Sequence, residues 1–507
     1  MPDRSQRSGP RRWTRESFLP FRLEALTPVF IGSGSDLSPL EYVIRQEGDV
    51  YALHLVDAAA WLQAAQDKAD IRKALDSGEM LNLRSLMDEH LDAALYSLAR
   101  VAVSSAALAE NLRAHIKNPG SLSNAEVQPL PRSPVTMAPY IPGSSLKGAL
   151  STALIDGLDH GGLRAVGRDN RAYADEMKRL LGSIRNHSMQ ALKVSDIPIP
   201  PGATRIVAAA EARLNPEKPG TPKTPCEVLP PAASGGLPLY GRLLMDAAGI
   251  GLPGGKVLSF ADLGTICKNF YEKRFREELG KFYRLPHLAE VGRRLKPVLS
   301  RMEKLDPQRE LLLRVGHYSH VECVTVSANA PRSRKGAGKT RTLADRELPF
   351  GWVVLCRCEE AEYKDGVARV EEAIKNARRE REQIRAVREE EIRRAVEEQR
   401  KRAQAVAEAR AKAAEEQRRK EREAAEREAA LAALSPEERA IAEVAAPDAP
   451  EERSMELFAR LDSLEGDLRV KAAAALRDCW QRLGKWQGKL SQKQQKKVAK
   501  VKQLLGE

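Results

Sequence analysis

The segment best suited to chemistry is a small-residue turn at Gly143, Ser144 and Ser145, which an extended stretch of chain enters. Either serine can cap the helix that follows, and such a helix start offers backbone N–H groups and the positive end of a dipole. Lys147 adds a positive charge in the first turn. Together these features suit a phosphate group. From these residues alone, an ordinary helix cap is the simpler interpretation.

A second turn of the same kind is formed by Gly32, Ser33 and Gly34. It follows a run near residues 21–26 whose alternating apolar and polar side chains predict a half-buried strand. Small residues let a backbone come close to a ligand. Taken singly, this turn is also a weak indication of a binding site.

A loop at residues 330–347 concentrates positive charge among serines and glycines. Its Gly338-Lys339-Thr340 stretch resembles the end of a nucleotide-binding P-loop, but Ser333 stands where that pattern requires a glycine. Nucleotide hydrolysis is therefore not expected. We expect a basic loop that contacts a polyanion such as RNA through Arg332, Arg334, Lys335 and Lys339.

Four residues near the loop could suggest a metal site, namely His317, His320, Glu322 and Cys323. The segment is predicted to be a strand, and two histidines three positions apart on a strand point to opposite faces. No flanking CxxC or HExxH pattern supports them. The sequence therefore predicts neither a metal nor a cofactor.

The charge distribution favours an anionic partner for the front of the chain. The 507 residues carry a formal net charge of +13, and residues 1–358 hold 49 Lys+Arg against 38 Asp+Glu. A basic folded region is typical of proteins that bind phosphate backbones or anionic surfaces. Ordinary solubility explains the same charge, so charge alone does not decide between them.

The six cysteines form no CxxC pair and are spread along the chain, as expected for reduced intracellular thiols. The first fifteen residues are polar and Arg-rich without an apolar core, so no secretory signal is expected. No apolar stretch approaches the roughly 18 residues of a membrane span. A cytoplasmic location is predicted, with no membrane partner.

The composition changes near Gly366. From residue 367 to residue 434 the chain has no Gly, Pro or aromatic residue, and 19 Lys+Arg nearly balance 16 Asp+Glu. Glu-to-basic pairs four residues apart favour a long solvated helix. Because Arg381 and Arg388 interrupt the heptad seam, a single helix is favoured over a tight coiled coil. Ser435 and Pro436 then begin a new helix in a small basic tail.

Taken together, the two glycine-serine turns resemble the RAMP superfamily of CRISPR-associated proteins. Within it, the match is closest to the subunits that cap the backbone of the type III-A (Csm) effector complex. The resemblance covers about residues 20–358 and also includes Leu37–Tyr42, Lys193–Asp196 and Pro349–Val353. One departure is the stretch Leu313–His320, where relatives usually carry a glycine-rich loop and this chain has a single glycine.

The resemblance implies an α+β chain of ferredoxin-like (RRM-like) units, expected to be two with insertions. The expected divisions are a disordered basic tail, a first unit, a second unit, a long charged helix and a small helical tail. Their boundaries are 1–20, 21–165, 166–358, 366–434 and 435–507.

The function that the resemblance implies is non-catalytic binding of guide RNA (crRNA). The subunit would cap a filament of RAMP subunits near the 3′ part of the guide, and would support guide maturation and complex assembly in antiviral defence. Its partners would be the guide RNA and other RAMP subunits, above all the repeated backbone subunit, and host nucleases are left open. A sheet face and the glycine turns would hold the RNA. The expected contacts are Gly32, Ser33, Gly34, Gly143, Ser144, Ser145, Lys147, Arg314, Arg332, Arg334, Lys335 and Lys339.

Two alternatives remain at this stage. Some RAMP relatives are metal-independent ribonucleases that process guide RNA, and here only His317-Tyr318 suggests the required general base. The other alternative is a scaffold whose long helix recruits a nuclease. A deletion that ends at residue 360 should separate the RNA-binding and scaffold interpretations.

Overall fold

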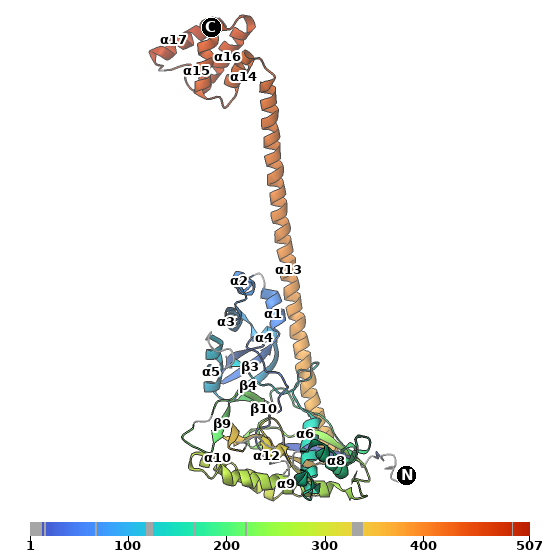
Figure 1. The fold of residues 1–507 in the computed structure, drawn as a ribbon. Helices are drawn as coiled ribbons and strands as arrows, with labels where there is room; N and C mark the ends of the chain where they lie inside the picture. The colour runs from blue at the N-terminus through green and yellow to red at the C-terminus, as the bar shows by residue number, and fades with distance from the viewer. Residues whose placement is uncertain are drawn as a thin grey trace. The chain divides into compact units, whose positions relative to one another are not determined.

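The computed structural model describes residues 13–14, 17–65, 68–117, 125–166, 169–218, 221–326, 338–488 and 490–507, without the side chains of 115–117. The chain divides into two compact units, residues 1–392 and 393–507. The first unit mixes helices with mainly antiparallel sheets, which confirms the predicted α+β class (Figure 1). Within the described ranges, no helix has the length and apolar character needed to cross a membrane.

A five-stranded antiparallel sheet forms the centre of the first unit, with the strand order β14-β17-β1-β11-β6. Its strands are β1 (Phe18–Ala25), β6 (Leu192–Val194), β11 (Leu239–Met245), β14 (Glu310–Arg314) and β17 (Trp352–Arg357). Strands from both sides of residue 165 therefore share one sheet. The division of residues 21–358 at that point stays a prediction.

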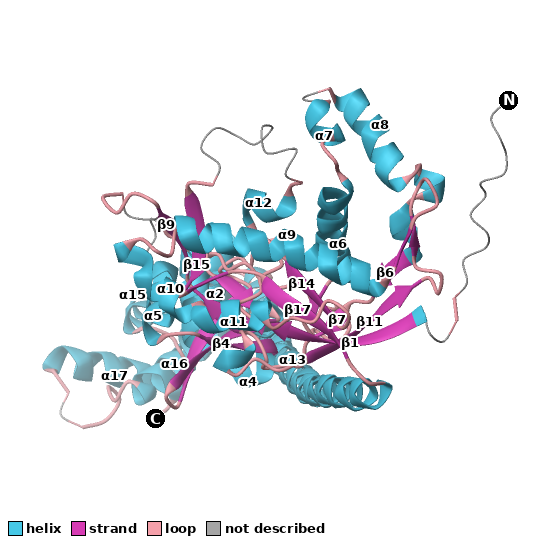
Figure 2. Cartoon of the chain, turned by 90° about the horizontal axis from the view of Figure 1, so that it is seen from below, coloured by secondary structure: helices cyan, strands magenta, loops and turns pink. Residues whose placement is uncertain are grey.

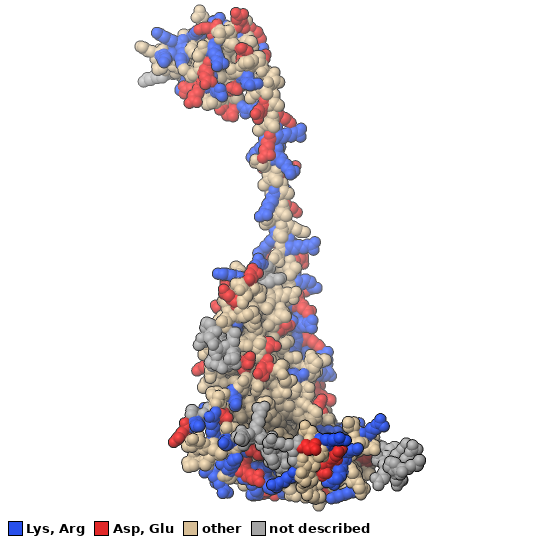
Figure 3. Space-filling model, viewed as in Figure 1, with Lys and Arg blue, Asp and Glu red and all other residues tan. Residues whose placement is uncertain are grey.

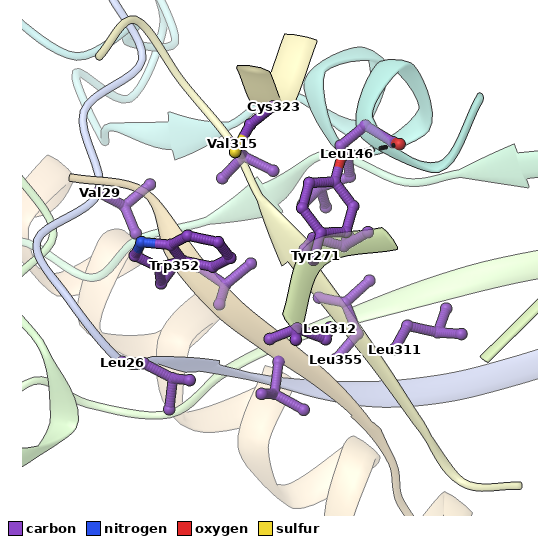
Figure 4. Close-up of a cluster of buried hydrophobic side chains, with 14 of the residues drawn as sticks. Leu26, Val29, Leu146, Tyr271, Leu311, Leu312, Val315, Cys323, Trp352 and Leu355 are labelled. Atoms are coloured by element: carbon purple, nitrogen blue, oxygen red, sulfur yellow. Dashed lines mark hydrogen bonds between the residues drawn. The ribbon is translucent and has the colours of Figure 1, made fainter. Parts of the chain in front are cut away.

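Two helices, α6 (Gly143–Leu158) and α9 (Phe260–Lys281), cover one face of this sheet. A capping box between Ser259 and Asp262 begins α9. The Tyr271 hydroxyl of α9 donates a hydrogen bond to the Ala149 carbonyl of α6 at 3.0 Å, and both helices pack on Trp352 and its neighbours in the sheet (Figure 4). Burying one such aromatic or aliphatic side chain contributes about 1.5–3 kcal/mol, so this layer holds the two helices firmly in place.

The opposite face of the sheet is covered by the start of α13 (Glu360–Ala432), on the other side of the sheet from α9 (Figure 2). Arg22 of β1 pairs with Glu362 at 3.1 Å, and Arg242 of β11 lies 4.4 Å from the Tyr363 ring. A Cβ on Gly366 would lie 2.3 Å from the Tyr240 ring, so only glycine permits this close approach. The start of α13 therefore restricts access to this central area, where the side chains of Arg22 and Arg242 stay 41% and 38% exposed, and the expectation that a sheet face holds RNA stays a prediction.

A second five-stranded sheet has the order β10-β8-β4-β3-β2. Its strands are β2 (Tyr42–Glu47), β3 (Val50–Val56), β4 (Ser97–Val103), β8 (Arg205–Val207) and β10 (Cys226–Val228). The helices near it in sequence are α1 (Ala58–Ala65), α2 (Ala69–Ser77), α3 (Met80–His90), α4 (Ala93–Tyr96) and α5 (Ala106–Lys117). In the chain, β4 lies between α4 and α5, and Val101 and Val103 of this strand are buried.

The remaining elements of the first unit are short. The strands are β5 (Tyr140–Ile141), β7 (Ile197–Pro198), β9 (Ala209–Arg213), β12 (Ile250–Gly251), β13 (Val257–Leu258), β15 (Thr340–Ala344) and β16 (Leu348–Pro349). The helices are α7 (Gly162–Ala165), α8 (Asn170–Leu181), α10 (Ala289–Arg294), α11 (Lys296–Glu303) and α12 (His320–Val324).

The second unit contains the rest of α13 and a small helical bundle. From residue 393 to residue 430 the side chains of α13 are exposed, and its ion pairs include Lys401–Glu397 at 2.8 Å and Lys420–Glu416 at 2.9 Å. Ser435 caps the next helix, as the sequence predicts. The bundle consists of α14 (Pro436–Ala445), α15 (Glu451–Arg460), α16 (Gly466–Arg482) and α17 (Gln492–Leu505).

Candidate functional site

A cleft of about 640 Å³ lies where three segments meet in the first unit. One wall is the turn Ile31–Asp36, which follows β1. A second wall is one side of α6, and the third is the stretch Arg314–Ser319 after β14. The tertiary structure thus brings both glycine-serine segments and the glycine-poor stretch to one place.

The start of α6 differs from the predicted cap. Pro142 occupies the cap position, no side chain caps the helix, and Ser144 and Ser145 lie in the first turn. The Gly143 N–H donates to the Asp196 carboxylate at 2.8 Å, so this amide is already used within the chain. A Cβ at Gly143 would lie 2.2 Å from the Val194 carbonyl oxygen. Gly143 is therefore required by the chain's own packing.

Only one side of α6 faces the cleft. Ser145, Gly148, Ala149 and Thr152 line it, at the spacing of one helical face. Lys147 does not line the cleft, because its position lies on the opposite side of the helix. Burial lowers the pKa of His187, and the charge of Lys147 lowers it further, which places Lys147 near that ring.

The turn at Gly32, Ser33 and Gly34 is exposed at the mouth of the cleft. The Ser33 N–H donates to the Pro129 carbonyl at 3.2 Å, and its hydroxyl donates to the Ser35 carbonyl at 2.8 Å. Gly34 has a φ of +93° with open space where a Cβ would stand, so its glycine serves the turn conformation. A ligand backbone can approach this turn from the open side.

In the glycine-poor stretch Leu313–His320, the single glycine, Gly316, holds the chain close to Phe30 just after β14. Gly316 has a φ of +94°, and a Cβ there would lie 2.0 Å from the Phe30 carbonyl oxygen. The His317 N–H donates to that same oxygen at 3.0 Å. The predicted strand at 317–320 is wrong, because Gly316 turns the chain after β14 and residues from His320 onward form α12. His317 remains exposed at the cleft.

Arg314 does not present its guanidinium to solvent. Its side chain is 1% exposed, pairs with Glu278 and donates to the Phe350 carbonyl at 3.0 Å. The guanidinium also lies 4.8 Å from the Trp352 ring centroid. The assignment of Arg314 as a direct RNA contact is therefore corrected, because its guanidinium is buried and already bound within the chain.

Glu278 is shared by two buried arginines. Arg341 lies 3.3 Å from one carboxylate oxygen of Glu278 and 3.0 Å from Glu322. Burial raises the pKa of Glu278, but the charges of Arg314 and Arg341 outweigh it and hold the pKa below its ordinary value. Burial and the same two arginines lower the pKa of His320 to about 3, and its ring accepts the Thr342 N–H at 3.2 Å. This buried cluster joins α9, β14 and β15.

Most of the basic loop lies outside the described residues, including Arg332, Arg334 and Lys335. Lys339 is exposed, and the neighbouring Gly338 carbonyl accepts a hydrogen bond from Lys281 at 2.5 Å. Thr340 begins β15, whereas the Lys-Thr of a P-loop opens a helix, so the rejection of a P-loop is supported. Among the described residues no cluster of side chains suits a metal ion.

Sequence reasoning missed Gly148, Ala149 and Thr152, although their spacing from Ser145 would have indicated one helix face. Within the described lining, the cations are limited to the buried Arg314, while Asp36 and His317 are exposed. A ligand here would therefore meet the hydroxyls of Ser33 and Ser145 and the exposed glycines of the turn. Such groups position a phosphate backbone without reading bases.

Comparisons with known proteins complete the description. The model of the RAMP superfamily matches residues 22–287. No curated protein matches the chain. A chain of the "Cryo-EM structure of Csm-crRNA-target RNA ternary complex in type III-A CRISPR-Cas system" shares 20% identity over 66% of this chain and 100% of that chain, with a TM-score of 0.47. The crystal structure of T. onnurineus Csm5 shares 18% identity over 66% of this chain and 99% of that chain, with a TM-score of 0.46.

Proposed function

The chain belongs to the RAMP superfamily, and on that premise we propose that it binds guide RNA as a non-catalytic subunit of a type III-A CRISPR effector complex. The observation that carries the proposal is the convergence of Gly32–Gly34 and one side of α6 on a single cleft. Because its sequence motifs resemble those of the capping subunits, the chain would lie at the end of the filament, near the 3′ part of the guide. There it would support guide maturation and contact other RAMP subunits.

The topology supports a ferredoxin-like arrangement for the central sheet. The elements β1, α6, β6, β11, α9 and β17 follow one another as βαββαβ, and their strands lie in the order β17-β1-β11-β6. β14 is then an added edge strand. We propose that this arrangement is one RAMP unit that spans both sides of residue 165, in place of the predicted division there, and that the long insertion carrying β2, β3 and β4 elaborates it.

The proposal is tested by recovering the tagged protein from its native cell and identifying the bound RNA and proteins. Repeat-spacer RNAs together with several RAMP subunits are expected. Unrelated RNA, or a protein recovered alone, would contradict the proposal. Copurified nucleases would identify the partners that the sequence left open.

Gly148→Glu should weaken guide-RNA binding about tenfold, which is about 1.4 kcal/mol and the size of one charge-assisted hydrogen bond. Gly148 is exposed at the cleft, and a Cβ there meets no atom within 4 Å, so the fold should tolerate the change. The new carboxylate would repel phosphates in the cleft. Binding is measured by fluorescence anisotropy over a salt series.

Gly280→Glu is the matched control, because Gly280 is an exposed helical glycine with equal space and lies outside the cleft. Its affinity should equal that of the wild type. Equal losses of guide-RNA affinity in Gly148→Glu and Gly280→Glu would show that the RNA does not bind in the cleft. Lys147→Glu belongs in the same assay, since a loss there alone would place the RNA on the other side of α6.

His317→Ala should leave guide-RNA length unchanged, because we propose that the subunit does not cut RNA. His317 is the exposed histidine of the cleft and the general base that the ribonuclease alternative names. Purified protein is incubated with repeat RNA in metal-free buffer. Cleavage by the wild type that disappears in His317→Ala would establish the ribonuclease alternative instead.

A further inference from the structure

We propose that the helical bundle at residues 435–507 binds single-stranded nucleic acid through a basic face of α17 beside Phe458. This site uses different residues from the cleft and goes beyond the function proposed above. It would be a second contact of the same chain with a polyanion.

The bundle has a hydrophobic core of its own that fixes α17. Trp480 of α16 is 1% exposed and Val501 of α17 is fully buried, and Val498 packs into the same cluster. Ser491 caps the start of α17 by accepting the Gln494 N–H, and Gly506 ends the helix in a left-handed conformation. The side of α17 opposite Val498 and Val501 is therefore held toward solvent.

Charge is distributed unevenly within this bundle. Residues 435–468 carry ten Asp+Glu and three Lys+Arg, whereas residues 469–507 carry two Asp+Glu and eleven Lys+Arg. Several of these cations are paired within the bundle, as in Lys485–Glu451 and Lys471–Asp467. The bundle as a whole is nearly neutral, so an anionic partner must be attracted by a local group of lysines.

Such a group lies along one face of α17. Lys493, Lys496, Lys497 and Lys500 recur at intervals of three, four and seven residues, which places them on one side of the helix. Lys500 pairs with Asp462, and the Lys497 ammonium lies 3.0 Å from the Met455 sulfur. Lys493 and Lys496 are exposed, and the described residues provide neither with an ion pair.

An aromatic ring borders this face. Phe458 of α15 is half-buried, and its ring centroid lies 5.6 Å from the Lys497 Nζ and 5.7 Å from the Lys500 Nζ. Its ring also packs against Trp480, with centroids 5.5 Å apart, which holds it in place. Figure 3 shows Lys and Arg side chains on the side of the bundle where Figure 1 draws α17.

Sites for single-stranded nucleic acid typically combine lysines that contact the phosphate backbone with an aromatic ring on which a base can stack. An acidic protein surface would satisfy the lysines but would not use the ring. The arrangement therefore favours single-stranded nucleic acid, with recognition that does not depend on sequence.

The test compares the full-length protein with the triple variant Lys493→Gln/Lys496→Gln/Lys500→Gln. The probes are RNA and DNA homopolymers of roughly 15 nucleotides, measured by anisotropy over a salt series. The slope of log affinity against log salt should fall by roughly 0.7 for each lysine that no longer neutralises a phosphate, or about 2 in total. The affinity itself should fall by about tenfold or more at low salt. Photo-crosslinking with a halogenated uridine oligomer should mark the peptide that contains Phe458.

The control Lys401→Gln/Lys412→Gln/Lys420→Gln removes the same charge from the exposed part of α13. It should retain the wild-type affinity and slope. Weaker binding by the α17 variant to both oligonucleotides, or to the RNA alone, supports the proposal. Equal behaviour of the two triple variants, or crosslinks confined to residues 1–392, would overturn it and leave this face to acidic proteins or to solvent.

Discussion

Glu278→Gln should destabilise the first unit by about 3–5 kcal/mol, the usual cost of removing one partner from a buried ion pair. The substitution leaves the Arg314 guanidinium without its carboxylate and Arg341 with Glu322 alone, in a place where both arginine side chains are at most 3% exposed. The same carboxylate accepts the Tyr283 hydroxyl at 2.8 Å. Urea denaturation followed by tryptophan fluorescence measures the destabilisation, since Trp352 lies beside Arg314.

Glu290→Gln is the matched control, because Glu290 pairs with Arg293 and Arg294 on the surface. Its denaturation midpoint should stay close to that of the wild type, since exposed ion pairs stabilise little. If the denaturation midpoint of Glu278→Gln were as close to the wild-type midpoint as that of Glu290→Gln, the buried arginines would have found other partners.

The difference between the wild type and Glu278→Gln should also depend on pH. The folded-state pKa of Glu278 lies below its ordinary value of 4.5, so its charge stabilises the fold at and above neutral pH. That contribution is lost as the pH falls below 4.5 through the folded-state pKa. The two midpoints should therefore approach each other in acid, and a gap that widens there would contradict the assignment.

A chain that ends at residue 359 should fail to fold stably, whereas a chain that ends at residue 392 should remain folded. The shorter chain lacks the start of α13, which exposes Tyr240 on the outer sheet face and leaves Arg22 and Arg242 without Glu362 and Glu360. Burying a side chain of that size contributes about 1.5–3 kcal/mol, and Val370 of the same helix segment is also buried. Soluble yield and thermal unfolding of the two chains measure the effect.

The chain of residues 1–392 also separates RNA binding from scaffolding. It retains the contacts of α13 with the first unit, including Arg388–Asp57 at 3.0 Å and the Arg381 bond to the Thr136 carbonyl. If the cleft holds the guide, this chain should bind guide RNA with wild-type affinity once the contribution of the α17 face is subtracted. Complete loss of RNA association by a folded 1–392 chain would favour the scaffold interpretation. Equal stability of both chains would show that α13 is dispensable for the sheet.

Local patterns in the sequence were sufficient for several features. The α+β class followed from strand and helix periodicities, and the Ser435 cap followed from a Ser-Pro pair and a glutamate three residues later. The charged helix was visible because no Gly, Pro or aromatic residue interrupts residues 367–434. The RAMP resemblance was visible because its motifs are contiguous in sequence. These signals are local, so they require no knowledge of which segments meet.

The tertiary structure decided what the polar and small residues do. Arg314 and Lys147 look alike in sequence, because both are basic residues in motifs. In the structure, Arg314 pairs with the buried carboxylate of Glu278 in α9, whereas Lys147 lies on the side of α6 that faces away from the cleft. Gly143 and Gly316 serve contacts with backbone carbonyls at Val194 and Phe30. Each of these outcomes depends on a partner far away in the chain, because burial and charge pairing arise only when distant segments pack together. The sequence by itself determined the α+β class, the long charged helix and the family, and packing alone determined which residues remain available to a ligand.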